Sequence, residues 1–327
     1  MDKKYYDNLI VSASPHLVTA MDTQKTMLMV LIALVPSLLV STYVFGFRVL
    51  ILTAVCIAAS MFFEWAWNKL MKRKQTVCDL SAALTGTLIA FNLPSGLPYW
   101  IAIVGCFVAI IVVKQLFGGI GKNLVNPAIT ARIVLFISFA TEMTTWPLPR
   151  MNQTADVLTG PTPLGVIAEG GQLPTNMEMF LGYIGGSMGE VSAIALIIGG
   201  LFLVWKKIIS PIIPCCFIGT VFVFALIYYS ATGNGDALQM AVFHILAGGV
   251  MLGAIFMATD YVTAPVTKWG QVIYAVLIGF LTAFIRTCGG STEGMSYAII
   301  ISNLLTPLIE KWTAPKPFGL EHKEASK

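Results

Sequence analysis

Long apolar runs alternate with short polar intervals along almost the whole chain. Ten runs have lengths typical of membrane-spanning helices: 26–46, 49–68, 79–94, 98–117, 124–141, 179–204, 208–230, 238–258, 270–287 and 295–312. A helix of about 20 residues crosses a hydrocarbon core of about 30 Å. The third run is short and ends at Asn92-Leu93-Pro94, which indicates a broken or re-entrant helix enclosed by protein. The pattern predicts an all-α polytopic membrane protein with about ten transmembrane helices.

The spacing of Pro and Gly residues predicts an internal repeat. A Pro before one apolar helix and a Gly-Gly pair at its end occur twice, 171 positions apart: Pro94, Gly118 and Gly119, then Pro265, Gly289 and Gly290. An interval of five helices reverses the orientation of the chain, so the halves would form two inverted five-helix repeats. Coincidence among 29 Gly and 16 Pro residues is the alternative.

These boundaries divide the chain into five parts. We expect a cytoplasmic N-terminal segment (1–25), a first five-helix repeat (26–141), an outer loop (142–178), a second five-helix repeat (179–312) and a cytoplasmic tail (313–327). The first part is polar and holds no apolar core followed by a cleavage site. We therefore expect no removable signal peptide.

The distribution of positive charge predicts the orientation in the membrane. Placing the N-terminus in the cytoplasm puts 16 of the 20 Lys and Arg residues at cytoplasmic helix ends. Cytoplasmic loops are rich in Lys and Arg, so both termini are expected inside and the 142–178 loop outside. Topology thus accounts for the net charge of +4, and we expect no nucleic acid partner.

Composition strengthens the membrane assignment and excludes other kinds of site. Hydrophobic residues make up 57% of the chain and charged residues 11%, whereas a soluble domain is about a quarter charged. The mean hydropathy is +0.80. The six Cys residues form no C-x-x-C pair, so we expect no disulfide framework and no iron–sulfur or metal site made by this chain alone. No G-x-G-x-x-G follows a strand, which argues against direct NAD binding.

A polar heptapeptide in the 142–178 loop carries the strongest chemical signal: Asp156-Val157-Leu158-Thr159-Gly160-Pro161-Thr162. The Thr162 hydroxyl is a nucleophile for a phosphoanhydride, and Gly160 lets a bulky group approach the backbone. Asp156 carries a carboxylate suited to the Mg²⁺ of an incoming nucleotide complex. A Pro/Gly turn between helices is the plainer interpretation.

Three more polar stretches lie at predicted helix ends. Asn123 and Asn126 follow a Gly-rich run and offer amide groups, or else cap a helix before Pro127. Asp260 stands among threonines as an ion-pathway candidate, with a helix cap as the alternative. Arg286 is one of few cations on the expected outer side, where it would act near a cofactor or pair with Glu293 at a helix end.

Together these motifs resemble the membrane flavoproteins of the Rnf and sodium-pumping quinone reductase complexes. The similarity runs in order from Ser14-Pro15-His16 through the Asn123/Asn126, Asp260 and Arg286 stretches to the last helix. In that family the final Thr of an Asp-x-x-Ser-Gly-Ala-Thr motif carries FMN through a phosphodiester, attached by a flavin transferase that uses FAD. Here Thr159 replaces the Ser and Pro161 the Ala, which keeps both hydroxyls and the Gly.

The resemblance implies covalent FMN on Thr162, with Asp156, Thr159 and Gly160 in recognition by the transferase. It also implies a non-covalent riboflavin nearer the cytoplasm, for which we select Asn123 and Asn126. The short N-terminal segment is more similar to the D subunits of Rnf complexes than to the quinone-reductase B subunits. We expect a bacterial inner-membrane location.

The D-subunit resemblance implies a role and a set of partners. The role is that of an electron-carrying membrane subunit of an ion-translocating ferredoxin:NAD oxidoreductase, without independent catalysis. The expected partners are the FMN-bearing G subunit, the small membrane A and E subunits, the flavin transferase and membrane lipid. A secondary transporter or channel of the inverted-repeat type without redox chemistry is the competing interpretation, and a purely structural assembly subunit is a third.

Overall fold

A computed structural model describes residues 21–150, 159–169, 171, 174–233, 236–289 and 294–315. The elements of the first part are α1 (Thr23–Phe45), α2 (Arg48–Leu70), η2 (Val77–Asp79), α3 (Ser81–Phe91), α4 (Tyr99–Phe107), η3 (Val108–Gln115), α5 (Pro127–Ser138) and α6 (Ala140–Thr144). The loop region holds β1 (Trp146–Pro147), β2 (Thr159–Gly160), α7 (Pro163–Glu169) and α8 (Asn176–Leu181). The remainder holds α9 (Ala193–Trp205), α10 (Ile212–Thr232), α11 (Ala237–Leu246), α12 (Val250–Leu252), η5 (Gly253–Met257), α13 (Lys268–Cys288) and α14 (Gly294–Thr313).

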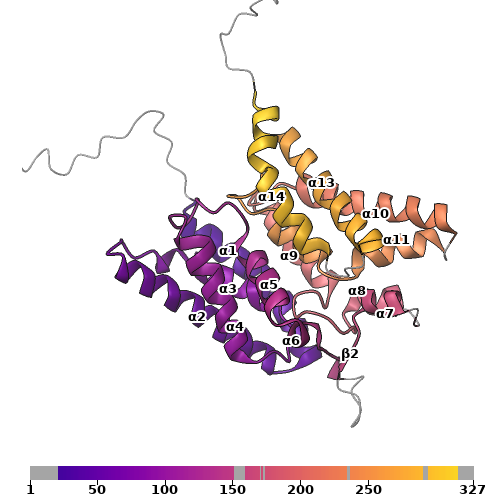
Figure 1. The fold of residues 1–327 in the computed structure, drawn as a ribbon, viewed down its shortest axis with the longest axis horizontal. Coiled ribbons are helices and arrows are strands. Elements are labelled where there is room, and N and C mark those ends of the chain that lie inside the picture. Colours follow the sequence, from indigo (N-terminus) through magenta and orange to yellow (C-terminus); the bar gives the residue numbers. More distant parts are fainter. Residues whose placement is uncertain are drawn as a thin grey trace, which may run out of the picture.

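The helices form two lobes that share a central contact region (Figure 1). In the first lobe α2 packs against α3 and α4, and in the second α10 packs against α11 and α13. The lobes meet where α1 packs against α9 and α5 packs against α14. Several contacts rely on glycine: a Cβ on Gly199 of α9 would overlap the Ala33 carbonyl oxygen of α1. Small residues allow this close approach of helices.

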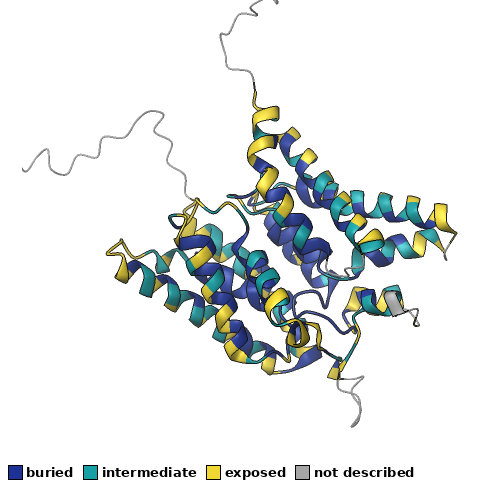
Figure 2. Cartoon of the chain, in the orientation of Figure 1, coloured by how far each residue is buried: buried dark blue, intermediate teal, exposed yellow. Residues whose placement is uncertain are grey.

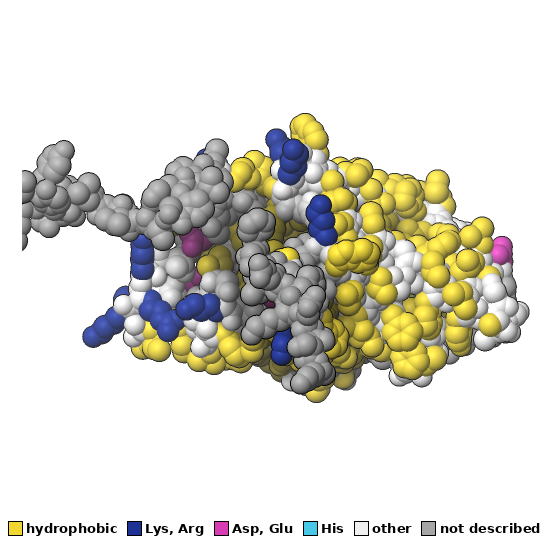
Figure 3. All heavy atoms as spheres, turned by 90° about the horizontal axis from the view of Figure 1, so that it is seen from above, with side chains coloured by type: hydrophobic (Ala, Val, Ile, Leu, Met, Phe, Trp, Pro, Cys, Tyr) yellow, Lys and Arg dark blue, Asp and Glu magenta, His cyan; other side chains and the backbone are white. Residues whose placement is uncertain are grey.

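Buried side chains concentrate between the lobes, whereas the peripheral helices expose one face (Figure 2). Many exposed residues are large and apolar, among them Leu39, Phe62, Leu201 and Ile227. A space-filling view shows this apolar surface with Lys and Arg gathered in a few places (Figure 3). Four described helices, α1, α2, α10 and α13, are long and apolar enough to cross a membrane. A fifth span is the bent pair of α11 with α12 and η5. Such a chain is a multi-pass membrane protein.

Each of the ten apolar runs contains a helix, but several of these helices are shorter than a full span. Helices α3, α5 and α9 and the α4–η3 pair are apolar helices of intermediate length. The run 179–204 differs most from the sequence prediction, since its helix begins only at Ala193. Helix α8 ends at Gly182, whose φ of 108° suits glycine, and 182–192 is not helical. The count of ten spanning helices stays a prediction.

The non-helical 182–192 segment lies inside the protein and its backbone is bonded there. The Met188 N–H donates to the Leu93 carbonyl at 3.1 Å, and the Gly189 N–H to the Phe91 carbonyl at 2.7 Å. The Ser41 hydroxyl donates to the Met188 carbonyl. Irregular backbone at membrane depth requires such internal partners. These bonds fasten the segment to the end of α3.

The loop region forms a small structure of its own. Strands β1 and β2 pair antiparallel, with Trp146 opposite Gly160 and Pro147 opposite Thr159, a minor departure from the all-α prediction.

The start of α1 and the end of α14 lie on one side of the molecule, and β2 lies on the other (Figure 1).

Candidate functional site

Thr162 stands directly before α7, where its side chain caps the helix. The Thr162 Oγ1 accepts a hydrogen bond from the Gly165 N–H at 3.2 Å, and Pro163 occupies the first helical position. The residue is half-buried. Thr159 and Gly160 precede it in β2, where pairing with β1 fixes the approach of the chain. Asp156 lies outside the described residues, as do Glu293 and the Ser14-Pro15-His16 stretch.

Thr162 lines a small cavity with about 10 Å³ of space for a water-sized molecule, which we call the Thr162 pocket. Its lining residues come from the loop region, the 182–192 segment and the α11–α12 break: Thr162, Pro163, Leu164, Ile184, Gly185, Gly186, Glu190, Val191 and Gly248. Gly248 has a φ of +65°, and a Cβ there would overlap Leu164 and Arg286. Position 248 therefore requires glycine, both for its backbone conformation and for its close packing against these two side chains.

Apolar packing holds the loop region against the second lobe. Leu164 of α7 belongs to a buried cluster with Met179, Ile184, Phe243 and Ala247. Its side chain is 6% exposed. Burying a Leu contributes roughly 1.5–3 kcal/mol, so this contact fixes α7 and the preceding Thr162.

Arg286 lies next to Gly248, which lines the Thr162 pocket, and it also has a structural role. Its Nη1 donates to the His244 carbonyl at 2.8 Å and its Nη2 to the Ala247 carbonyl at 3.1 Å. Both acceptors are at the end of α11, where the chain bends by 61° into α12 and η5. The guanidinium thus satisfies carbonyls left open by the helix break. The sequence prediction that Arg286 acts near the attachment site remains compatible with this position.

Glu190 and Arg132 form a buried ion pair that the sequence alone did not connect to the site. Arg132 Nη1 lies 3.2 Å from Glu190 Oε1 and 2.9 Å from Asn92 Oδ1. Glu190 lines the Thr162 pocket. The available signal was a single acid within the apolar run 179–204, because charges at membrane depth are rare and need partners.

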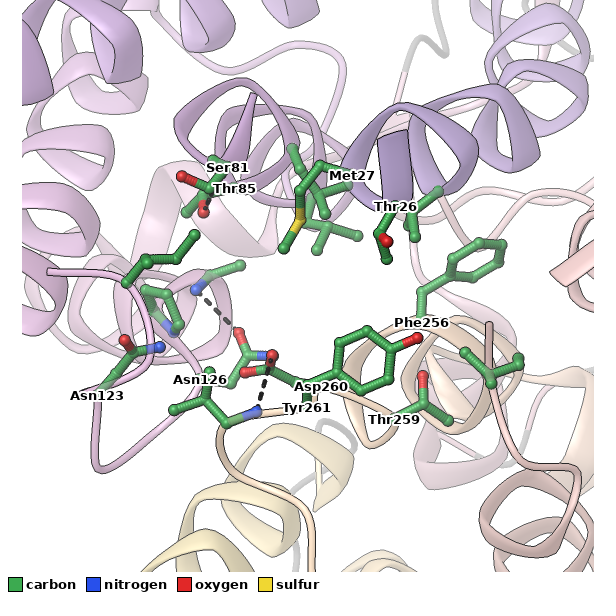
Figure 4. Close-up of a pocket in the computed structure, with 18 of the residues that line it drawn as sticks. Thr26, Met27, Ser81, Thr85, Asn123, Asn126, Phe256, Thr259, Asp260 and Tyr261 are labelled. Carbon is green, nitrogen blue, oxygen red and sulfur yellow. Dashed lines mark hydrogen bonds between the residues drawn. The ribbon is translucent and has the colours of Figure 1, made fainter. Parts of the chain in front are cut away.

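A second cavity lies between the lobes, with about 840 Å³ of empty space including its mouth. We call it the Asn126 cavity, and its polar lining residues include Thr26, Ser81, Thr85, Lys114, Asn123, Asn126, Thr259, Asp260 and Tyr261. Figure 4 shows Ser81 and Thr85 on one side, with Asn126 and Asp260 across the space. The structure thus brings together three of the predicted site residues, Asn123, Asn126 and Asp260.

The two asparagines differ in how fully they are bonded. Asn126 Oδ1 caps α5 by accepting from the Ala128 and Ile129 N–H groups, and its Nδ2 donates to the Met257 carbonyl at 3.2 Å. The buried Asn123 Oδ1 has no hydrogen-bond partner among the described residues. The capping alternative therefore applies to Asn126, whereas Asn123 offers an acceptor to a ligand.

Lys114 lies in the last turn of η3, at a helix end as the charge distribution predicts, but its side chain is not exposed there. Its side chain is buried, 3.0 Å from Glu64 Oε2 and 2.8 Å from Ser81 Oγ. Gln115 and Thr76 also donate to Glu64. The pair forms part of the interior beside the Asn126 cavity, because a buried lysine requires a carboxylate partner.

Asp260 follows the end of η5, outside the membrane-spanning helices. Its carboxylate accepts from the Val262 N–H at 3.5 Å and from the Thr263 hydroxyl at 3.3 Å. Burial raises the pKa of the Asp260 carboxyl, and these two hydrogen bonds oppose that shift. Asp260 therefore organises its own turn and also faces the cavity. Among the described residues, no group of three or more His, Cys, Asp or Glu side chains is placed to hold a metal ion.

The helical membrane fold and the two cavities define a polytopic membrane protein with internal polar sites. Comparison with known families is consistent with this class: the NQR2, RnfD, RnfE family matches residues 10–319. The chain belongs to this family.

Similar proteins are the D subunits of ion-translocating redox complexes. The chain is 44% identical to the D subunit of the Na(+)-translocating ferredoxin:NAD(+) oxidoreductase complex of Acetobacterium woodii, covering 96% of each chain. It is 39% identical to the proton-translocating counterpart of Clostridium ljungdahlii, covering 94% of this chain and 96% of that one. It is 34% identical to the D subunit of the ion-translocating oxidoreductase complex of Aliivibrio salmonicida, covering 96% and 99%.

Proposed function

We propose that this protein is the flavin-carrying electron-transfer subunit of a membrane complex that couples ferredoxin:NAD oxidoreduction to Na⁺ or H⁺ translocation. The observation that carries the proposal is the end-to-end similarity to D subunits of such complexes. The position of Thr162, half-buried directly before α7 and lining a small pocket, is compatible with the flavin role. The other subunits, including G, A and E, would supply the remaining electron carriers.

Attachment of the flavin would use the Thr162 hydroxyl as the nucleophile. Its oxygen attacks the flavin-side phosphorus of FAD, the phosphoanhydride bond breaks, AMP leaves and the hydroxyl proton passes to water. A separate flavin transferase would catalyse this step. The bound FMN supplies one- and two-electron chemistry, while the protein positions it. The Thr162 pocket holds only about 10 Å³, so a flavin attached to the Thr162 oxygen would lie mainly outside it.

A second carrier is proposed for the Asn126 cavity. Electrons from a cytoplasmic donor cannot reach the opposite face in one step across about 30 Å of hydrocarbon. The enclosed part of the cavity holds about 110 Å³, less than the roughly 300–1,000 Å³ usual for small-molecule sites, so a flavin ring would also occupy its mouth. Its walls are mainly apolar, with the unpartnered Asn123 Oδ1 as a polar contact, which suits the ring of a non-covalent riboflavin.

The orientation and the repeats belong to the same proposal. The start of α1 and the end of α14 lie opposite β2, which supports cytoplasmic termini with Thr162 on the outer face (Figure 1). The recurrence of the same neighbours, α2 with α3 and α4, then α10 with α11 and α13, supports two inverted five-helix repeats.

Replacing the nucleophile tests the proposal directly. Thr162→Val is nearly isosteric but has no hydroxyl, so covalent flavin should vanish while the protein still reaches the membrane. Flavin fluorescence of the band on a denaturing gel, with mass spectrometry of the tryptic peptide, measures the adduct. Thr162→Ser should keep part of the flavin, and Thr159→Val should lower attachment less than Thr162→Val.

Thr175→Val is the matched control, because Thr175 also caps a loop helix but lies outside the pocket lining. Loss of either cap should lower stability by about 1 kcal/mol, and only Thr162→Val should abolish the adduct. An adduct that persists in Thr162→Val, or one mapped to Thr159, rejects the assignment. A wild-type band without fluorescence would favour a transporter or an assembly subunit without redox chemistry.

A further inference from the structure

Glu190 occupies an unusual place for a carboxylate, at the junction of the Thr162 pocket and the protein interior. The residue is 7% exposed. A Cβ on Gly249, at the start of α12, would lie 2.8 Å from Glu190 Oε1, and one on Gly186 would lie 3.8 Å from Oε2. The carboxylate therefore touches the helix break that, through Gly248, forms one wall of the pocket.

A buried chain of polar groups in the protein interior fixes the orientation of Glu190. Arg132, 2% exposed, contacts Glu190 Oε1 at 3.2 Å and Asn92 Oδ1 at 2.9 Å. Asn92 in turn donates to the Leu88 carbonyl at 2.6 Å. Arg132 belongs to α5 and Asn92 to the end of α3, so two elements of the first lobe hold a side chain that faces the loop region.

Stability alone does not account for this pair. Removing two charges from water costs several kcal/mol each, and replacing a buried pair with well-packed apolar residues is often neutral or stabilising. A buried charge in the wall of a pocket, however, acts strongly on any group near that pocket, because the protein interior screens the charge poorly. Glu190 lines the same pocket as Thr162, so its charge would act on a group attached to Thr162.

We propose that Glu190, oriented by Arg132 and Asn92, is a positioning residue that sets the electrostatic potential felt by the flavin on Thr162. This inference rests on the proposed flavin attachment. A carboxylate nearby disfavours the negatively charged reduced flavin, and Arg132 behind it limits that effect. The pair would thus hold the midpoint potential of this flavin between the values that either charge alone would produce.

Two single variants and their combination test the proposal in the assembled complex. Glu190→Gln keeps the size and one acceptor, so it should raise the midpoint potential of the covalent flavin. Arg132→Gln removes the opposite charge and should lower it. The double variant restores neutrality and should return the potential close to that of the wild type. Redox titration followed by flavin absorbance gives the potential, and mass spectrometry gives the extent of attachment.

Glu142→Gln is the matched control, since Glu142 is an exposed carboxylate on α6 outside the pocket lining. It should leave the potential unchanged. If Arg132→Gln fails to fold because a buried carboxylate loses a charged partner, Glu190→Gln and the double variant still show in which direction Glu190 shifts the midpoint potential. Potentials that do not rise in Glu190→Gln relative to Glu142→Gln overturn the inference while attachment to Thr162 stands. A wild-type protein without covalent flavin overturns both.

Discussion

The Asp260 side chain takes part in a local turn and also lines a cavity. It accepts two hydrogen bonds within its own turn, yet it also faces the Asn126 cavity. Asp260→Asn keeps the size and one acceptor but removes the charge. If the carboxylate handles an ion, this variant should lower coupled ion transport in proteoliposomes several-fold while covalent flavin stays intact.

Asp236→Asn provides the comparison for that experiment. Asp236 caps α11 by accepting from the Leu238 N–H at 3.1 Å, and an Asn preserves the cap. It lines neither cavity described above. Equal transport rates in the two variants would mean that Asp260 acts only in its own turn and has no role in ion transport.

Individual residues also show where sequence reasoning stops. The cap that Asn126 forms on α5 could be read from its place before Pro127, but its hydrogen bond to the Met257 carbonyl joins residues 131 positions apart. Glu190 is a lone acid within an apolar run, and only folding reveals Arg132 as its partner 58 positions earlier. Residue chemistry was therefore readable from local motifs, whereas the pairing of buried charges was set by long-range contacts.

At the scale of elements, the 182–192 segment depends on a close approach at Gly189. A Cβ there would lie 2.6 Å from the Phe91 Cβ and 2.9 Å from the Phe91 carbonyl oxygen. Gly189→Val should force the segment away from α3 and lower the free energy of unfolding by about 1–3 kcal/mol. Thermal denaturation of the detergent-solubilised protein measures the change.

Gly219→Ala should behave differently, since Gly219 of α10 has nothing within 4 Å of an added Cβ. Alanine in a helix interior is favoured over glycine by about 0.5–1 kcal/mol, so the melting temperature should hold or rise slightly. A melting temperature that falls equally in both variants would mean that glycine is not needed for space at position 189.

Helices with continuous apolar runs were predicted well, as was the early end of the third run before Asn92-Leu93-Pro94, but the breaks within the runs 179–204 and 238–258 were not. The runs at α1, α2, α10 and α13 match the structure within a few residues. The run 179–204 reads as one helix because its residues are apolar and small. Gly182, with its positive φ, instead ends α8, and Gly189 allows the non-helical segment to approach and bond to the end of α3. Amino-acid composition indicates which segments are buried, but it does not indicate which backbone groups will form hydrogen bonds with one another.

At the scale of the whole molecule, orientation is the main prediction that remains. A single cysteine introduced at Gln153 should react with a membrane-impermeant thiol reagent in intact cells, because the loop before Thr162 is expected outside. A cysteine at Lys72 should react only after the cells are opened. Labelling is to be measured in a background with the exposed Cys78, Cys215 and Cys288 replaced. The reverse pattern would place Thr162 on the cytoplasmic face.

The polar contacts where the lobes meet bear on how the protein can move. Asn126 joins α5 to the end of η5, and Arg132 joins α5 to the 182–192 segment. A rocking motion of one lobe against the other would break the hydrogen bond between Asn126 and the Met257 carbonyl. Asn126 therefore couples the position of α5 to that of η5, so that a shift of one lobe is transmitted to the other.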